Sequence, residues 1–172
     1  MDIKITLLLL LILLFTSGCY ATLKGKVIDG ETGEPIEGAV AMAEWTKTKG
    51  IGNTYTVSAR VVETMSDKEG TIEISGCWCP FTDKPDLTIY KKGYVAWNSR
   101  IIFPHRKKRE GFEWRDDQVF SLEKFGEGYL YNEHLSFIRS SINSTIGYEK
   151  KKIIIKAFEW ETDMKLKERR RK

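Results

Sequence analysis

The pattern of hydrophobic and polar positions changes twice along the chain. A predominantly apolar run from Ile5 to Phe15, which no charged residue interrupts, comes first. Short segments follow as far as Leu122, in which apolar and polar residues alternate or β-branched residues gather, with turn-forming residues between them. From about Phe125 apolar residues recur every three to five positions, as they do in amphipathic helices. The pattern predicts a leader, a β-rich body and a helical extension.

The β-rich body contains seven short segments with the character of strands. Turn formers separate them, notably the run Asp29–Pro35 and the run Asp67–Gly70. Several short strands without helical periodicity between them predict a mainly β fold, an antiparallel β-sandwich. The expected strands are residues 23–27, 39–45, 55–64, 71–74, 87–90, 95–103 and 118–122.

The helical extension contains two amphipathic stretches. The first is expected to end near Gly147, and the second closes with a cationic run from Lys165 to Lys172, which suits the negative end of a helix dipole. The apolar face of the second stretch has three conceivable partners: the sandwich itself, an anionic membrane surface or the groove of another protein. The apolar positions are Leu130, Leu135, Ile138, Ile142 and Ile146 in the first stretch and Ile153, Ala157, Trp160 and Met164 in the second.

The leader has the features of a secretion signal. Its apolar run follows Lys4 and is shorter than the roughly 20 residues that a membrane-spanning helix needs. The next residues, Thr16-Ser17-Gly18-Cys19, resemble the lipobox of bacterial lipoproteins, with Thr16 where that family usually has leucine. The resemblance implies cleavage of residues 1–18 and attachment of a diacylglycerol to Cys19. An ordinary secretory signal and an uncleaved anchor are the other interpretations of these residues.

The lipobox resemblance also predicts a location. Several acyl chains on one cysteine would hold the protein firmly on a bacterial membrane, since each buried CH₂ contributes about 0.8 kcal/mol. The residue after the cysteine is Tyr20 and not the Asp that usually signals retention in the inner membrane. In a cell with two membranes we therefore expect the protein on the outer membrane, facing the periplasm.

The body resembles the carboxypeptidase regulatory-like domain in the order of its short motifs. That resemblance implies a transthyretin-like (prealbumin-like or Ig-like) β-sandwich over residues 19–125, with residues 126–172 as an extension outside the pattern. In the family this domain is non-catalytic and serves interaction or folding. The matching segments are Gly25–Asp29, Thr32–Ala39, Asp67–Ile74 and Leu87–Tyr94.

Charge is concentrated in two places. The chain carries a net charge of +4, while residues 149–172 alone carry +5. A second basic run, Pro104–Arg109, precedes the aromatic residues Phe112 and Trp114. Such a run suits phosphate, lipopolysaccharide or an acidic glycan, or it forms a solvated loop whose charge the following acidic residues neutralise. Export excludes nucleic acid as a partner.

Few residues are candidates for catalysis, metal binding or a disulfide bond. His105 and His134 lie far apart, without a His-x-x-Glu partner, and no serine lies in a Gly-x-Ser-x-Gly elbow. The sequence thus predicts no enzyme, no cofactor and no metal site. Cys77 and Cys79 are candidates for a disulfide in an oxidising compartment, for a reduced structural pair or for a soft-metal site that lacks a third ligand.

Together these features predict a lipid-anchored, non-catalytic module of the cell envelope that recognises an envelope protein or a glycan. The runs Asp67–Gly70 and Phe103–Asp117 are the candidate contact regions. One alternative is a structural envelope protein whose basic helical tail contacts a membrane or a larger assembly. Another is an accessory subunit of a separate peptidase.

Overall fold

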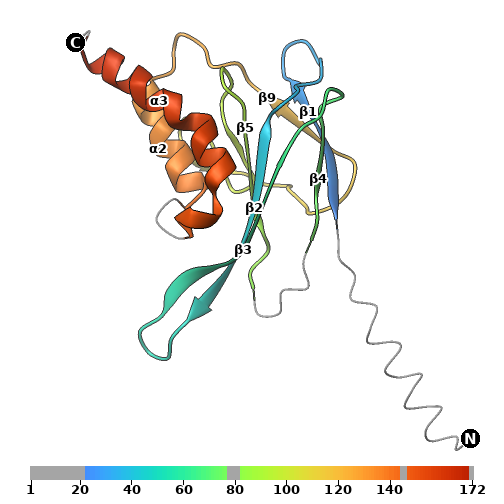
Figure 1. Cartoon of the computed structure of the whole chain (residues 1–172), viewed down its shortest axis with the longest axis vertical. Coiled ribbons are helices and arrows are strands. Elements are labelled where there is room, and N and C mark those ends of the chain that lie inside the picture. The colour runs from blue at the N-terminus through green and yellow to red at the C-terminus, as the bar shows by residue number, and fades with distance from the viewer. Residues whose placement is uncertain (1–21, 77–81, 144–146, 171–172) are drawn as a thin grey trace, which may run out of the picture.

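Two packed β-sheets and a pair of helices make up the computed structural model, which describes residues 22–76, 82–143 and 147–170 (Figure 1). One sheet has three strands in the order β4-β1-β9, the other has four in the order β3-β2-β5-β6, and β7 and β8 form a small hairpin. The strands are β1 (Leu23–Asp29), β2 (Val40–Lys49), β3 (Tyr55–Met65), β4 (Thr71–Ile74), β5 (Asp86–Tyr90), β6 (Trp97–Asn98), β7 (Ile101–Ile102), β8 (Lys107–Lys108) and β9 (Gln118–Leu122). The helices are α2 (Tyr131–Ser141), the short 3₁₀ turn η1 (Tyr148–Lys150) and α3 (Lys152–Arg170).

The three-stranded sheet follows the period of two that the sequence predicts. In β1 the side chains of Leu23 and Val27 are buried, whereas Lys24 and Lys26 are exposed. The Phe120 ring packs against Gly25, and a Cβ at position 25 would come within 2.5 Å of that ring. The inner face of this sheet packs on the inner face of the four-stranded sheet and forms the first hydrophobic core.

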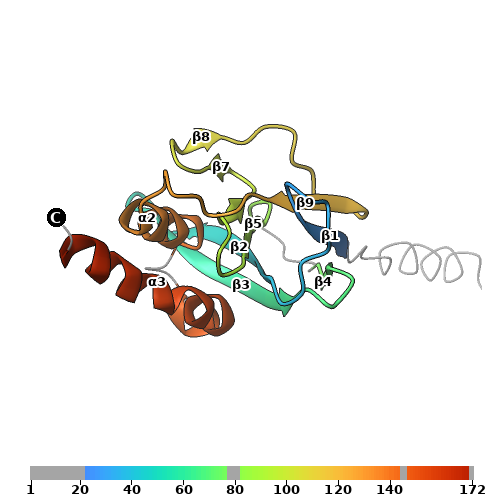
Figure 2. The same ribbon diagram turned by 90° about the horizontal axis from the view of Figure 1, so that it is seen from above.

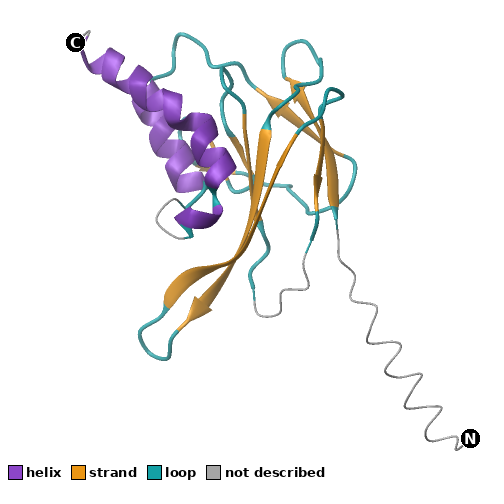
Figure 3. Ribbon diagram, in the orientation of Figure 1, coloured by secondary structure: helices purple, strands orange, loops and turns teal. Residues whose placement is uncertain are grey.

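Strand β2 is buried on both faces, which explains its lack of alternation. Ala41 and Ala43 face the first core, while Val40 and Met42 face a second core formed with the helices. The second core takes Leu135 and Ile138 from α2 and Ile154, Ile155 and Phe158 from α3. Figures 2 and 3 show the two helices side by side on the outer face of this sheet.

The architecture confirms the mainly β fold with antiparallel sheets and a C-terminal helix pair. Three partners were considered for the apolar face of the second helix. In the structure this face packs on the sandwich of the same chain. One strand pair differs from the antiparallel expectation, since β1 and β9 run parallel, with Gly25 beside Gln118 and Asp29 beside Leu122.

Two elements depart from the expected boundaries. The expected strand over 95–103 is divided into β6 and β7, because the carboxamide oxygen of Asn98 accepts the backbone N–H groups of Arg100 and Ile101 and forms a turn there. Helix α2 ends at Ser141 and not near Gly147, and Asn143 has a positive φ of 46°.

The turn after β1 is built as its sequence predicts. Gly33 and Gly38 both have positive φ, of 74° and 69°. The carboxylate of Asp29 accepts the N–H groups of Glu31 and Thr32. Those bonds hold the pKa of Asp29 low, at about 2.

Candidate functional site

A pocket of about 840 Å³ opens at the end of the four-stranded sheet. Five separate parts of the chain line it: the middle of β2, Gly76 after β4, the approach to β5 with its first residue, the turn between β6 and β7, and the loop before β9. The volume lies in the range of sites that take small organic molecules. Its described lining is Trp45, Thr46, Gly76, Asp83, Lys84, Pro85, Asp86, Ser99, Arg100, Phe112, Glu113, Trp114 and Arg115.

The course of β2 creates this opening. Strand β2 pairs with β5 only from Val40 to Glu44, so beyond Glu44 its partner is β3 alone. The register of the β2–β3 pair shifts between Trp45 and Thr46, and such an irregularity bends a strand. The pocket occupies the place where β2 and β5 separate.

One wall of the pocket is aromatic. The rings of Trp45 and Trp114 meet edge to face with their centroids 5.6 Å apart. Phe112 lies on the same loop as Trp114 and packs edge to face on Trp97, at 5.5 Å. The guanidinium of Arg60 lies 5.6 Å from the Trp45 ring on the side of β3. These contacts fix the loop over the sheet and leave Trp114 and Phe112 half-buried.

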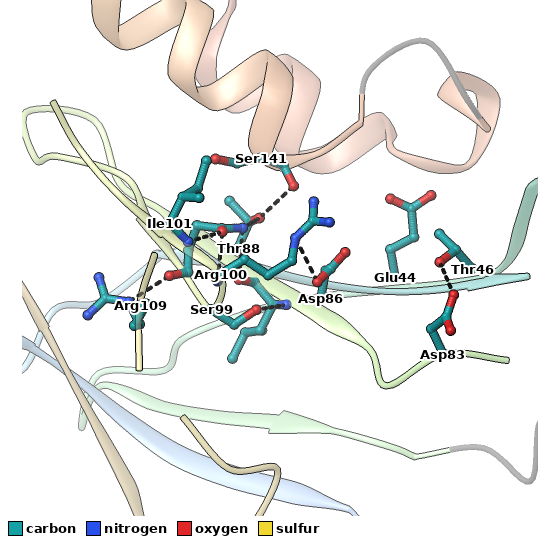
Figure 4. A network of polar contacts seen from close by, with 12 residues as sticks. Glu44, Thr46, Asp83, Asp86, Thr88, Ser99, Arg100, Ile101, Arg109 and Ser141 are labelled. Carbon is teal, nitrogen blue, oxygen red and sulfur yellow. Dashed lines mark hydrogen bonds and ion pairs between the residues drawn. The ribbon is translucent and has the colours of Figure 1, made fainter. Parts of the chain in front are cut away.

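A second part of the lining, the charged wall, is polar, and Figure 4 shows its side chains. Arg100 Nε lies 2.9 Å from Asp86 Oδ1, and Thr46 donates a hydrogen bond of 3.4 Å to Asp83. The backbone is fixed as well, because Asp83 N–H donates to the carbonyl of Thr46 and Leu87 N–H donates to Ser99 Oγ. Asp83, Asp86 and Arg100 are therefore held in place. The Asp86 side chain lies on the same face of the sheet as Glu44, whereas Trp45 lies on the face toward the first core.

Asp86 is the titratable group with the most perturbed environment in this wall. Burial raises its pKa to about 6, and the attraction of Arg100 only partly opposes that effect. Glu44, directly opposite on β2, adds a like charge that raises the pKa further. The pocket thus holds a carboxyl group that changes charge close to neutral pH.

Behind this wall lies a buried ion pair between the sheet and the helix pair. Lys151 Nζ lies 2.8 Å from Glu44, and it also donates to the carbonyls of Ile142 and Asn143. Both side chains are almost fully buried. This pair holds the residue before α3 against β2 and has a structural role.

The arrangement is suited to binding. Half-buried aromatic faces beside carboxylates and a guanidinium offer both an apolar platform and paired hydrogen-bonding groups. Within residues 22–76, 82–143 and 147–170, no group of three or more His, Cys, Asp and Glu side chains is placed to hold a metal ion.

The turn Asp67–Gly70 was predicted as a contact region. In the structure its polar groups form hydrogen bonds within the turn and to β1. The Asp67 carboxylate accepts the N–H groups of Glu69 and Thr71. Gly70 has a φ of 76°, and its carbonyl accepts a hydrogen bond from the N–H of Val27. These contacts give the turn a structural role between β3 and β4.

The other predicted contact region, Phe103–Asp117, divides in two. Its second half forms the aromatic wall of the pocket. In its first half the basic run is only partly solvated, because the guanidinium of Arg109 stacks 4.5 Å from the Trp97 ring and donates to the carbonyl of Asn98. Arg106 donates to Ser136 on α2, so the run is tied to the helix as well.

His134 belongs to a buried network that joins the helices to the sheet. Its Nε2 accepts the N–H of Ala96, so Nδ1 carries the proton and donates to the carboxylate of Glu161 at 3.0 Å. Tyr90 donates to the same carboxylate, and Trp160 donates to the Tyr90 hydroxyl. With every polar atom of the imidazole occupied, His134 has a structural role.

Three predicted sites lie outside the described residues. They are Cys19, the predicted lipid attachment point, and Cys77 and Cys79, the candidate disulfide. Lipidation and disulfide formation therefore stay predictions. In the part of the chain that is described, no helix combines the length and apolar character needed to cross a membrane.

No protein-family model and no curated protein matches the chain, so its resemblance to the carboxypeptidase regulatory-like domain also stays a prediction. Among solved structures, the chain is similar to the pilus 2b backbone protein of group B streptococcus, with 16% identity, a TM-score of 0.34 and coverage of 61% of this chain and 41% of that one. It is similar to the C-terminal domain of the shaft pilin SpaA from Lactobacillus rhamnosus GG, with 17% identity, a TM-score of 0.33 and coverage of 60% and 97%. A 9R-lipoxygenase from Cyanothece matches with 12% identity, a TM-score of 0.33 and coverage of 59% and 16%.

The chain spans less than half the length of the pilus backbone protein. All these TM-scores are low, and the matched proteins differ in function. The class of this protein follows from its own architecture, a mainly β fold of two packed sheets with a helix pair on one outer face.

Most of the pocket residues were missed by reasoning from the sequence. Trp45, Asp83, Asp86 and Arg100 come from three segments with no shared motif, and only the fold brings them together. The one local signal was Phe112 and Trp114, two aromatic residues in a charged loop.

Proposed function

We propose that this chain is a lipid-anchored, non-catalytic module of the cell envelope that binds a glycan through the pocket between Trp114 and Asp86. The observation that supports the proposal most directly is the pairing of an aromatic wall with a charged wall in one pocket. Sugar rings present C–H faces that pack on aromatic side chains and hydroxyl groups that bond to carboxylates and guanidinium groups. The lipobox-like segment ending at Cys19 supports an envelope location, where such glycans are abundant.

The remaining features fit a role in binding. Both ring nitrogens of His134 form structural hydrogen bonds, and the carboxylate of Glu161 already accepts two donors. The resemblance of the body to the carboxypeptidase regulatory-like domain supports the same role, since that domain has no catalysis of its own. An accessory function beside a separate peptidase would use the same pocket.

Titration with N-acetylglucosamine oligosaccharides and with soluble peptidoglycan fragments tests the proposal. We expect saturable binding by calorimetry, and a loss of about tenfold in affinity for Trp114→Ala, because an aromatic contact contributes roughly 1 kcal/mol or slightly more. Trp160→Phe, on the distant helix α3, is the matched control and should bind as the unaltered chain does.

If the partner is an envelope protein and not a glycan, we expect a different result. In that case neither sugar probe binds, and crosslinking in cells through a photoreactive residue at position 115 yields one discrete protein adduct that Trp114→Ala abolishes. Equal losses of sugar binding in Trp114→Ala and Trp160→Phe would refute the assignment of the pocket.

A further inference from the structure

The β2–β3 hairpin leaves the body of the protein and ends in a fully exposed isoleucine. Beyond Trp45 the two strands form a two-stranded ribbon that pairs Thr46 with Ser58 and Lys49 with Tyr55. Four further pairs at about 3.3 Å each carry the ribbon roughly 13 Å past Trp45. All nine residues from Thr48 to Thr56 are exposed, and Ile51 at the turn has a relative exposure of 105%.

The side chains of this ribbon are sorted between its two faces. Residues paired across an antiparallel ribbon share a face, so Lys47 and Val57 lie on the same side as Lys49 and Tyr55. The other side carries only hydroxyl groups, from Thr46, Thr48, Thr56 and Ser58. From Thr46 to Ser58 there are two lysines and no acidic residue.

The position of the ribbon adds a second, independent observation. Figure 1 shows the ribbon projecting past the end of the sandwich at which β1 begins, whereas α3 ends at the opposite end of the molecule. Only three residues lie between Cys19 and the first residue of β1, Leu23, so four steps of at most about 3.5 Å each join them. A lipid attached to Cys19 would therefore lie within about 14 Å of the start of β1.

We propose that the β2–β3 hairpin inserts Ile51 into the headgroup region of the membrane on which the chain is anchored. Tyrosine and lysine are the residues that mark a membrane–water interface, and each lysine near an anionic surface adds attraction. Ile51 at the turn enters the apolar boundary, Tyr55 lies one step behind it, and Lys47 and Lys49 meet the phosphate groups. With the lipid as a second contact, the hairpin fixes the orientation of the sandwich relative to the membrane. This inference rests on the proposed lipid anchoring.

Site-specific photocrosslinking tests the hairpin directly. A photoreactive amino acid replaces Ile51 in the full chain in cells, and Leu166 is replaced in a matched control. Leu166 is an exposed aliphatic residue between Lys165 and Lys167, so it also has lysines nearby, and it belongs to the last turns of α3. We expect phospholipid adducts at position 51 and none at position 166. Lys47→Gln/Lys49→Gln should lower the yield of those adducts several-fold.

The other outcomes overturn the proposal in distinguishable ways. Lipid adducts at position 166 but not at 51 would assign membrane contact to the basic tail. A discrete protein adduct at 51 would assign the hairpin to a protein partner. Failure of the lipid anchor is measured separately, by whether Cys19→Ser releases the chain from the membrane fraction. If the unaltered chain is absent from the membrane fraction, the same crosslinking is carried out with phosphatidylglycerol vesicles. The absence of lipid adducts at position 51 on these vesicles would refute insertion of the hairpin.

Discussion

Asp86 is a carboxyl group that the fold places where its ionised form is disfavoured. Its carboxyl group has an arginine 2.9 Å away, yet burial and the carboxylate of Glu44 raise its pKa from 3.8 to about 6. An acid whose pKa is higher in the folded state than in the unfolded state holds its proton more tightly when folded. Its contribution to stability is therefore complete below pH 4 and is lost as the pH rises through 6.

We expect the Asp86→Asn protein to lose this part of the pH dependence. Urea denaturation of the unaltered chain at pH 4.5 and pH 7.5 should reveal a component that falls with rising pH by about 2 kcal/mol. The full difference of about two pKa units corresponds to about 3 kcal/mol, and about 1 kcal/mol of it is already lost at pH 4.5. The variant should lack that component. Asp163→Asn, at an exposed position on α3, is the control and should keep it. Identical pH profiles for the unaltered chain and Asp86→Asn would contradict the pKa assigned to Asp86.

At the scale of elements, the attachment of the helix pair depends on buried polar contacts as much as on apolar ones. Glu161 on α3 receives hydrogen bonds from His134 on α2 and from Tyr90 on β5, so three elements meet at one carboxylate. A buried donor that loses its acceptor costs about 1–3 kcal/mol. The network therefore specifies how the helices sit on the sheet.

Glu161→Ala should lower the free energy of unfolding by about 3 kcal/mol or more, because both the imidazole and the Tyr90 hydroxyl lose their acceptor and a cavity forms. The measurement is denaturant unfolding followed by circular dichroism. Asp163→Ala, two residues further along α3 and exposed, should change stability by less than about 0.5 kcal/mol. Similar stabilities for the two variants would mean that the network contributes little.

The sequence predicted the elements with clear periodicity and missed what depends on long-range contact. The alternation of Leu23, Val27, Ile72 and Ile74 located β1 and β4, and the glycines after β1 located its turn. The spacing of Leu135 and Ile138 located α2. Nothing local to Gln118–Leu122 indicates that β9 runs parallel to β1, because the direction of pairing depends on the path of the intervening chain. The candidate pocket was missed for the same reason.

At the scale of the whole molecule, the second core makes the helix pair and the sandwich interdependent. The outer face of the four-stranded sheet has Met42 and Tyr90 fully buried, and helix side chains cover them. Without the helices this apolar face would meet water, at a cost of about 25 cal/mol per Å². Removal of the chain after Tyr148 would also leave the partners of Lys151 and Glu161 without these contacts.

We expect a chain truncated after Tyr148 to lose its cooperative fold, and the full chain to unfold in one transition. Coincident urea curves from tryptophan fluorescence and from far-ultraviolet circular dichroism check the second expectation. A full chain with two separate transitions, or a truncated one with a sharp unfolding curve, would show that the sandwich is independent of α3.

The parallel pairing of β1 with β9 has a consequence for how this protein reaches its folded form. The two strands are about ninety residues apart, as the register of Gly25 with Gln118 shows, and contacts between such distant residues are slow to form. A chain that crosses a membrane in an extended form delivers its first strand early and its last strand late. During that interval β1 has one edge without a neighbour and Phe120 is missing from the core, a state that invites pairing with other chains. Under the export that the leader predicts, the speed of delivery and any factor that shields that edge would therefore decide how much of the chain becomes native.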